Sequence, residues 1–359
     1  MAQRIIVVGA GIIGAGIAMR LARAGADVTV IAGQAPLATT ASFGWINASF
    51  FLDDDHHRLR AEGIAAWHRL TDEDAIDLQW SGCLCWDLPV PDLEKLADQL
   101  GELSYPVEWQ SPQAIASKEP ALRAVPEVAL HFPVEGAAPS ADMPNRLLAV
   151  AEAAGAKVIR GLQVNRVLQA DDGRSGVETA QGVLWADQVV LATGTGTQAL
   201  AGSIGARVPM LHRPAYNMRT KPVTPILRHI LASPIGEIRQ EPSGHILMPA
   251  AAHHQADSSD QLTEMPNEAA DAAMVRLREF LNGIEDLDWS EIMYGERPVP
   301  ADGKPVIGSL AENVYVACLH SGITLGPIVA ELAAQEIAGR LDNAGAALLA
   351  PYRPDRFAQ

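Results

Sequence analysis

The sequence predicts an α/β protein, because the elements of a parallel sheet recur at three distant places in the chain. Residues 4–31 form an apolar strand, a glycine turn, an Ala-rich helix and a second strand. A buried strand with its own glycine turn follows at 188–194, and a third strand and helix close the chain at 313–337. We therefore expect a Rossmann-like domain of discontinuous segments, and an inserted α+β domain with a mixed or antiparallel sheet. The segments are 1–50, 135–208 and 292–359 for the first domain, and 51–134 and 209–291 for the second.

The first strand runs directly into a glycine motif, RIIVVGAGIIGAGIAMRLARAGADVTVIAG. Gly9 suits the tight turn after the strand, Gly11 lets backbone N–H groups approach a pyrophosphate, and Gly14 allows close packing of helix on strand. The helix N-terminus then favours the negative charge of a phosphate. This motif predicts that the chain binds a dinucleotide.

The segment 51–134 predicts an insertion rather than more nucleotide-binding sheet. Apolar residues recur at helical spacing from His56 to Leu70, and acidic residues 53–55 favour the start of that helix. A strand over 80–86, an amphipathic helix over 93–100 and several Pro turns follow.

From residue 140 onward the sequence predicts one helix, a series of short strands, and then two further helices with a strand between them. Ser140 can cap a helix that runs through Ala154 and ends at Gly155. Four short strands and then a buried one occupy 156–191, and short β segments alternate with turns from Met210 to Met248. A helix over 267–281 precedes the final strand at 313–317 and helix at 324–337.

Composition argues against nucleic acid and integral membrane partners. The 359 residues carry 27 Lys and Arg against 43 Asp and Glu, a formal net charge of −16. Nucleic acids and anionic membranes both require a basic face. With no apolar run long enough for a bilayer, and a strand that begins by Arg4, we expect a cytoplasmic protein.

Cysteine and histidine spacing predicts neither a disulfide framework nor a metal site. Cys83, Cys85 and Cys318 suit buried thiols. The pairs His56-His57 and His253-His254 lack a matching set of carboxylates or cysteines, so we interpret them as solvated side chains.

The glycine motif alone leaves NAD, NADP and FAD open. Its place at the start of the chain, with the second turn at Ala192-Thr193-Gly194, favours FAD, because an extended FAD needs a second contact between strand and turn. The alternative for that turn is a tight connection after a buried strand.

Further motifs carry a family resemblance over essentially the whole chain: TTASFGWINA, HHRLRAEGIAAWHRL with SGCL, VVLATG, ERPVPADGKPVIG and HSGITLGP. In order and approximate spacing they resemble the superfamily of FAD enzymes that contains D-amino-acid oxidase, glycine oxidase and sarcosine oxidase (the DAO family). The resemblance implies non-covalent FAD, since Met293-Tyr294 stand where sarcosine oxidases use a cysteine.

The same resemblance implies a substrate site. Arg297, in the segment GERP, matches the arginine that pairs with the substrate carboxylate, a role that suits a guanidinium because it holds two oxygens at once. Glu296 would compete for Arg297 if it pointed into the site; otherwise it is a surface residue beside an arginine in a structural ion pair. His320 and Tyr216 are candidates for substrate or flavin contacts, with a supporting or core role as the alternative for each.

Cofactor contacts are implied at several further positions. The last helix begins beside the flavin ring, where its N-terminus would stabilise negative charge on reduction; a structural turn is the alternative. The resemblance places cofactor contacts at Thr39, Thr40, Ser42, Asn47, Val164, Thr193, Gly194, Ser321, Gly322, Ile323 and Thr324.

One expected group is missing. The second strand usually ends in an acidic residue that binds the adenosine ribose, and Ala32 stands there. Its loss would weaken FAD binding by roughly tenfold or more. We hypothesise that Gln34 reaches back as a neutral substitute.

Together these features predict FAD-dependent oxidation of the carbon–nitrogen bond of an amino acid or a carboxylated amine. A hydride would pass from the α-carbon to flavin N5, and the imine would then hydrolyse in water. Two alternatives remain: an NAD(P)-dependent dehydrogenase, and a subunit of a larger amine dehydrogenase without activity of its own.

Overall fold

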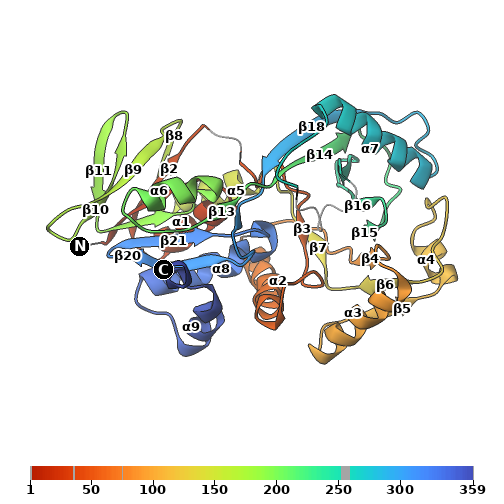
Figure 1. Cartoon of the computed structure of the whole chain (residues 1–359), viewed down its shortest axis with the longest axis horizontal. Helices are drawn as coiled ribbons and strands as arrows, with labels where there is room; N and C mark the ends of the chain where they lie inside the picture. The colour runs from red at the N-terminus through yellow and green to blue at the C-terminus, as the bar shows by residue number, and fades with distance from the viewer. Residues whose placement is uncertain (1, 35–36, 75, 252–258, 359) are drawn as a thin grey trace.

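The chain folds around two large sheets that lie side by side in an elongated molecule (Figure 1). The structure is a computed structural model that describes residues 2–34, 37–74, 76–251 and 259–358. Three smaller sheets complete the described β structure.

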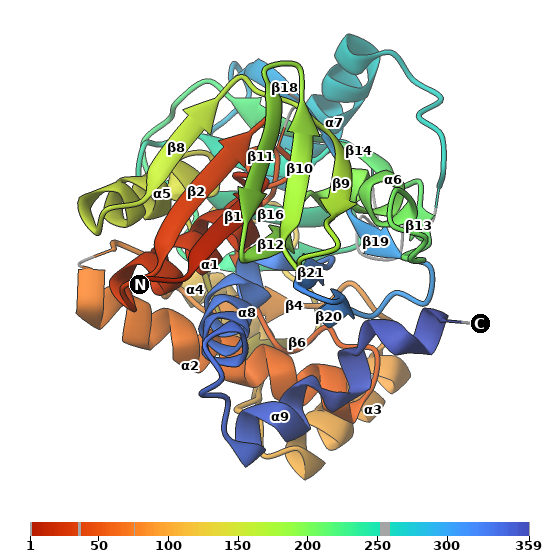
Figure 2. The same ribbon diagram turned by 90° about the vertical axis from the view of Figure 1, so that its left-hand side faces the viewer.

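The first large sheet has six strands in the order β20-β21-β12-β1-β2-β8 (Figure 2). Its strands run parallel except for β20, which pairs antiparallel with β21. The central strand β1 is buried from Ile5 to Val8, as expected for a parallel strand covered on both faces. The bounds are β1 Arg4–Val8, β2 Asp27–Ala32, β8 Lys157–Arg160, β12 Gln188–Leu191, β20 Val306–Ala311 and β21 Val314–Cys318.

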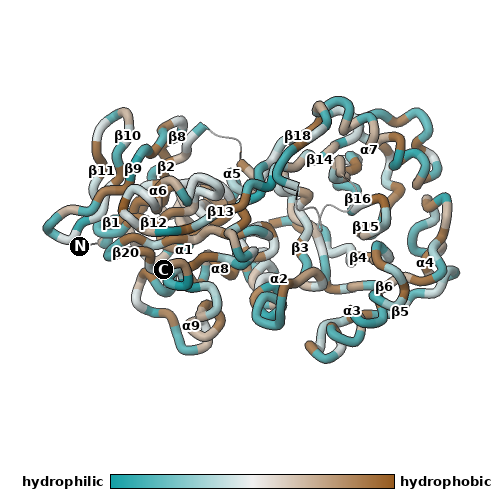
Figure 3. Tube along the Cα trace, in the orientation of Figure 1, coloured by the Kyte–Doolittle hydropathy of each residue, from teal (hydrophilic) through white to brown (hydrophobic). Residues whose placement is uncertain are grey.

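Three helices, α1 (Ile12–Arg23), α5 (Met143–Ala153) and α8 (Gly322–Ile337), pack against this sheet, and α2 (Asp54–Asp74) packs on α8. Helix α1 packs between α5 and α8. Small residues let α1 and α8 approach closely, since a Cβ added at Gly326 would lie 3.2 Å from Ile12 Cγ1. In the hydropathy colouring α8 is largely hydrophobic, whereas part of α2 is hydrophilic (Figure 3).

The second large sheet has eight strands in the order β18-β14-β17-β16-β15-β4-β6-β5. It is mixed, because β4 and β15 run parallel whereas the other described neighbours are antiparallel. The predicted mixed sheet is confirmed. The bounds are β4 Cys83–Cys85, β5 Glu108–Gln110, β6 Ala129–Phe132, β14 Pro214–Thr220, β15 Ile230–Ser233, β16 Gly236–Gln240, β17 Ile246–Pro249 and β18 Trp289–Glu296, with helices α3 Val90–Glu102, α4 Pro112–Lys118 and α7 Pro266–Phe280 nearby.

Smaller elements connect the two halves. A ribbon of two short strands, β3 and β7, lies where the halves meet (Figure 1). The division into domains stays a prediction, and β18 crosses its boundary at residue 292. The remaining bounds are β3 Trp45–Ile46, β7 Gly136–Ala137, β9 Val164–Gln169, β10 Ser175–Thr179, β11 Gly182–Ala186, β13 Met210–Leu211, β19 Val299–Pro300, α6 Thr197–Gly202 and α9 Asn343–Leu349.

Two local predictions were wrong. Ser140 does not cap a helix, because its hydroxyl donates to Ser42 O at 2.7 Å and α5 begins only at Met143. His56 and His57 are buried rather than solvated. The ring of His56 accepts from Leu52 N at 3.1 Å, and that of His57 packs edge-on against Phe51.

The remaining predictions on cysteine, histidine and membrane segments have mixed outcomes. Cys83, Cys85 and Cys318 are free and buried, as predicted. The pair His253-His254 lies outside the described residues. None of the helices in the described ranges combines the length and the apolar character that a bilayer crossing requires.

The contact of α2 with α8 generates a stability prediction, because both helices meet at a glycine. A Cβ at Gly63 would lie 2.5 Å from Thr324 O, in the first turn of α8, whereas a Cβ at Gly101 in α3 would meet nothing within 4 Å. We expect Gly63→Ala to lower the free energy of unfolding by about 1–3 kcal/mol through overpacking. Gly101→Ala should raise it by about 0.5 kcal/mol. Urea unfolding of both variants checks this, and equal effects of the two substitutions would contradict it.

Candidate active site

One cavity of about 930 Å³ lies at the carboxyl ends of the parallel strands. Its wall includes the residues that follow β1, β2, β12 and β21, and it extends across to Ala215 and Asn217 on β14 and Glu237 on β16. Ligands of open α/β sheets bind at this edge, and the volume is in the range of cofactor sites. The cavity therefore joins the two large sheets in one site.

The first glycine turn is built for close backbone approach. Gly9 adopts a φ of +106°, and a Cβ there would lie 2.2 Å from Ala192 O. A Cβ at Gly14 would lie 2.0 Å from Gly9 O. Side chains are thus excluded at both positions, as the motif predicts for a dinucleotide site. Gly11 lines the cavity as the N-cap of α1 and offers no side-chain cap to the helix.

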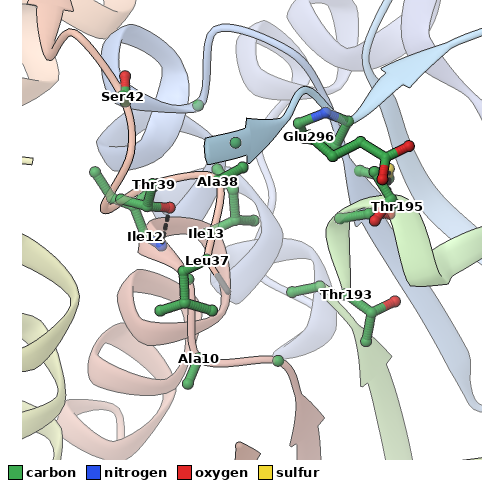
Figure 4. Close-up of a pocket in the computed structure, with 18 of the residues that line it drawn as sticks. Ala10, Ile12, Ile13, Leu37, Ala38, Thr39, Ser42, Thr193, Thr195 and Glu296 are labelled. Atoms are coloured by element: carbon green, nitrogen blue, oxygen red, sulfur yellow. Dashed lines mark hydrogen bonds between the residues drawn. The ribbon is translucent and has the colours of Figure 1, made fainter. Parts of the chain in front are cut away.

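The loop after β2 covers the start of α1. Thr39 Oγ1 accepts from Ile12 N at 3.2 Å, and Figure 4 shows this contact beside Leu37, Ala38 and Ser42. Thr40 instead donates to Leu37 O at 2.9 Å within the turn and does not line the cavity. The glycine turn, the N-terminus of α1 and the hydroxyls of Thr39 and Ser42 fit a pyrophosphate.

Among the residues that the structure describes, no acidic side chain lines the cavity at the end of β2. Ala32 pairs in register with Arg160 of β8, and both line the cavity. Gln34 is exposed and does not line it. Instead the amide of Gln163 lies over the strand end, since a Cβ at Gly33 would stand 2.6 Å from Gln163 Oε1. Gln163, and not Gln34, therefore lines the cavity at the end of β2.

The opposite end of the cavity is formed by the start of α8. Thr324 Oγ1 donates to Trp45 O and accepts from Asn47 N, both at 3.2 Å, so the helix is fixed to the segment after β3. Trp67 Nε1 on α2 donates to Ile323 O at 2.8 Å. The positive end of the α8 dipole is therefore held at the cavity wall.

Arg60, a residue that sequence reasoning missed, links these segments. Its guanidinium is buried and lines the cavity, and burial lowers the pKa of Arg60 to about 10, which leaves the side chain charged at neutral pH. Burial also raises the pKa of the neighbouring Glu135 to about 7. Hydrogen bonds from Ser49 and Tyr105 and the charge of Arg60 lower the pKa of Glu135, but burial has the larger effect. Arg60, Ile64 and Trp67 share one helix face by spacing, so a basic residue on an apolar face was the available clue.

Arg297 and Glu296 both line the cavity. Arg297 is half-buried, and its Nε donates to Arg213 O at 3.3 Å. The carboxylate of Glu296 pairs with the Nδ1 of His212 and points toward Thr195 in Figure 4. Glu296 thus has a partner other than Arg297.

Tyr216 does not reach the cavity wall. Side chains alternate along β14, so Ala215 and Asn217 line the cavity and Tyr216 does not. Its ring instead lies edge-on against Tyr294, 6.0 Å between centroids. Asn217 Nδ2 donates to Ala41 O at 2.5 Å, which ties this strand to the loop after β2.

Most of the predicted site residues converge on this one cavity. Gly14, Gln34, Thr40 and Tyr216 are the predicted residues that do not line it. Those that do are Gly9, Gly11, Thr39, Ser42, Asn47, Val164, Thr193, Gly194, Arg297, His320, Ser321, Gly322, Ile323 and Thr324.

Comparison with known proteins gives a family match and curated relatives. Residues 4–336 match the family model DAO, described as FAD dependent oxidoreductase. The bifunctional protein ThiO/ThiG of Nostoc sp. (strain PCC 7120) is 26% identical over 355 residues, which cover 94% of this chain and 53% of that protein. A D-amino acid dehydrogenase of Cereibacter sphaeroides is 27% identical over 163 residues, 45% of this chain and 37% of the relative. The chain thus spans about half the length of its ThiO/ThiG relative.

Solved structures share the fold at low sequence identity. Glycine oxidase from Geobacillus kaustophilus superposes with a TM-score of 0.87 at 22% identity and 99% coverage of both chains. L-proline dehydrogenase from P. horikoshii gives 0.85 at 20% identity, covering 99% of this chain and 98% of the other. Iminodiacetate oxidase from Chelativorans sp. BNC1 gives 0.84 at 20% identity, with 98% and 99% covered.

The cavity wall at the end of β2 generates an affinity prediction. If Gln163 binds the ribose hydroxyls, Gln163→Ala should weaken FAD binding by about threefold to tenfold, the effect of one lost neutral hydrogen bond. Gln34→Ala is the matched control and should leave the affinity unchanged. Titration of the apoprotein with FAD, followed by flavin fluorescence, measures both. A larger loss for Gln34→Ala than for Gln163→Ala would assign the contact to Gln34.

Proposed function

Because the chain belongs to the DAO family of FAD-dependent oxidoreductases, we propose that it oxidises the carbon–nitrogen bond of an amino acid or a related carboxylated amine. The observation that carries this proposal is the placement of Arg297 in the wall of the cavity that also holds the glycine turn and the start of α8. The cofactor is FAD, and the family match replaces the NAD(P) alternative.

The reaction oxidises the substrate by two electrons. Bound FAD supplies the acceptor for the hydrogen of the α-carbon and its electron pair. The α C–H and N–H bonds break, a C=N bond forms, and the amine proton passes to water. Water then adds to the C=N bond and releases a carbonyl compound and an amine or ammonia.

In the proposal, the side chains of the protein orient the substrate and form no covalent bond to it. In the proposal, the guanidinium of Arg297 holds the carboxylate through two parallel hydrogen bonds. Its backbone is fixed because Arg297 N donates to Arg213 O at 2.9 Å, and Glu296 is paired with His212. Such orientation contributes to catalysis by fixing the reacting carbon in place.

Charge at the start of α8 supports the same reaction. The N-terminus of α8 and the buried cation Arg60 both line the wall near Asn47. Positive charge there favours an electron-rich, reduced cofactor over the oxidised one. The α8 N-terminus and Arg60 therefore suit a site that binds an electron-accepting cofactor.

We predict that Arg297→Met lowers kcat/KM for a carboxylated amine by about tenfold to a hundredfold, because a charge-assisted contact is lost. Arg297→Lys should recover part of this loss, since it keeps the charge without the fork. Arg146→Met, which removes an exposed arginine of α5, is the control and should not change kcat/KM. Unchanged kcat/KM in Arg297→Met would remove Arg297 from the substrate site.

The reaction class is tested by mixing the FAD-loaded protein with substrates in the absence of oxygen. The panel comprises D- and L-amino acids, glycine, sarcosine and cyclic imino acids. At least one carboxylated amine should bleach the flavin absorbance, whereas its decarboxylated analogue should do so far more slowly. Bleaching by none of the panel would favour the alternative of a subunit without activity of its own. Hydrogen peroxide formed on admitting air identifies an oxidase, and reduction of an added dye instead identifies a dehydrogenase.

A further inference from the structure

Arg60 connects two segments that are far apart in the sequence. Its Nε donates to Asn47 O at 3.0 Å, its Nη2 donates to Asn47 Oδ1, and its Nη1 donates to Ser321 Oγ at 2.8 Å. The side chain is 4% exposed although it borders the cavity. Burying a guanidinium costs free energy unless its N–H groups are hydrogen-bonded. The side chain of Arg60 is therefore held in the position that makes these three contacts.

Ser321 occupies an unusual backbone conformation at the start of α8. Its φ of 59° and ψ of 30° lie in the left-handed region, which non-glycine residues seldom adopt. Its hydroxyl does not cap α8. Instead, Ser321 Oγ contacts Arg60 Nη1 on one side and His320 Nδ1, at 3.2 Å, on the other.

The donor fixes the direction of the hydrogen bond between Arg60 and Ser321. A guanidinium can only donate, so Ser321 Oγ accepts from Arg60. The hydroxyl proton of Ser321 can then be donated to His320 Nδ1, which must be unprotonated to accept it. The nearby positive charge of Arg60 also disfavours a protonated imidazole. In that arrangement His320 is a neutral ring with its proton on Nε2.

We propose that Arg60 is a positioning residue that acts through Ser321 to fix His320 as a neutral hydrogen-bond donor at the cavity wall. His320 then serves bound FAD as an Nε2–H donor, and it is not the base that takes the substrate's amine proton. The inference rests on the proposed function only in that FAD occupies the cavity. It adds roles for Arg60 and Ser321 and selects one of the roles open to His320.

The test is nitrogen NMR of the FAD-loaded protein labelled with ¹⁵N-histidine, with the His320 resonances assigned by their loss in His320→Gln. The wild-type protein should show the neutral Nε2–H pattern at neutral pH. Ser321→Ala and Arg60→Met should both lose this fixed pattern. Arg58→Met is the matched control, because Arg58 lies two residues away on α2 and is exposed in an ion pair with Asp55.

A second readout is the reduction potential of the bound flavin. Removing the buried charge in Arg60→Met should shift the ratio of oxidised to reduced flavin about tenfold toward the oxidised form, which is about 30 mV for a two-electron couple. Arg60→Lys should recover part of this shift, whereas Arg58→Met should show none. If Arg60→Met does not fold, the wild-type and Ser321→Ala spectra still decide the question.

Two results would overturn the proposal: a wild-type His320 that is protonated or carries its proton on Nδ1, or a folded Arg60→Met variant with unchanged His320 resonances and potential. Neither readout requires substrate turnover. Failure of the proposed amine oxidation would therefore leave this test intact, and failure here would leave the reaction class untouched.

Discussion

The close approach of two loops at the carboxyl edge of the parallel sheet is the constraint on which the site depends. Gly9 and Ala192 follow neighbouring parallel strands, and no Cβ fits between them. Gly14 lets α1 approach the same turn from the other side. Because the backbone itself forms this end of the cavity, a phosphate can approach the turn closely and lie against the positive end of the α1 dipole.

The other end of the cavity depends on buried polar groups rather than on glycines. Glu135 accepts hydrogen bonds from Trp45 Nε1 at 2.9 Å and Ser49 N at 3.1 Å, while Arg60 holds Asn47 and Ser321. Together they connect the segment after β3, helix α2 and the start of α8. Such a network is stabilising only when its members are paired, which gives this end one arrangement. The same arrangement places the buried guanidinium of Arg60 at the cavity wall.

Much of the fold was predictable because its elements are local in sequence. The strand–glycine–helix motif, the second turn at Thr193-Gly194 and the buried thiols each followed from residue type and spacing. The residues that were misplaced depend on three-dimensional pairing. The register of β14 turns Tyr216 away from the cavity, and the connection after β8 brings Gln163 over Gly33 in place of Gln34. His56 and His57 are buried because α2 packs under α8 and next to Tyr105, which no periodicity of their own segment indicates.

The central claim is that FAD and a substrate carboxylate share the cavity, with the carboxylate on Arg297. A crystal structure of the FAD-loaded protein with acetate as a minimal carboxylate tests it most directly. The account predicts the pyrophosphate at the turn of Gly9 and Gly11, the flavin ring beside the start of α8, and the acetate oxygens about 3 Å from the guanidinium of Arg297. Acetate bound elsewhere in the cavity, with the Arg297 guanidinium directed away from the flavin, would contradict it.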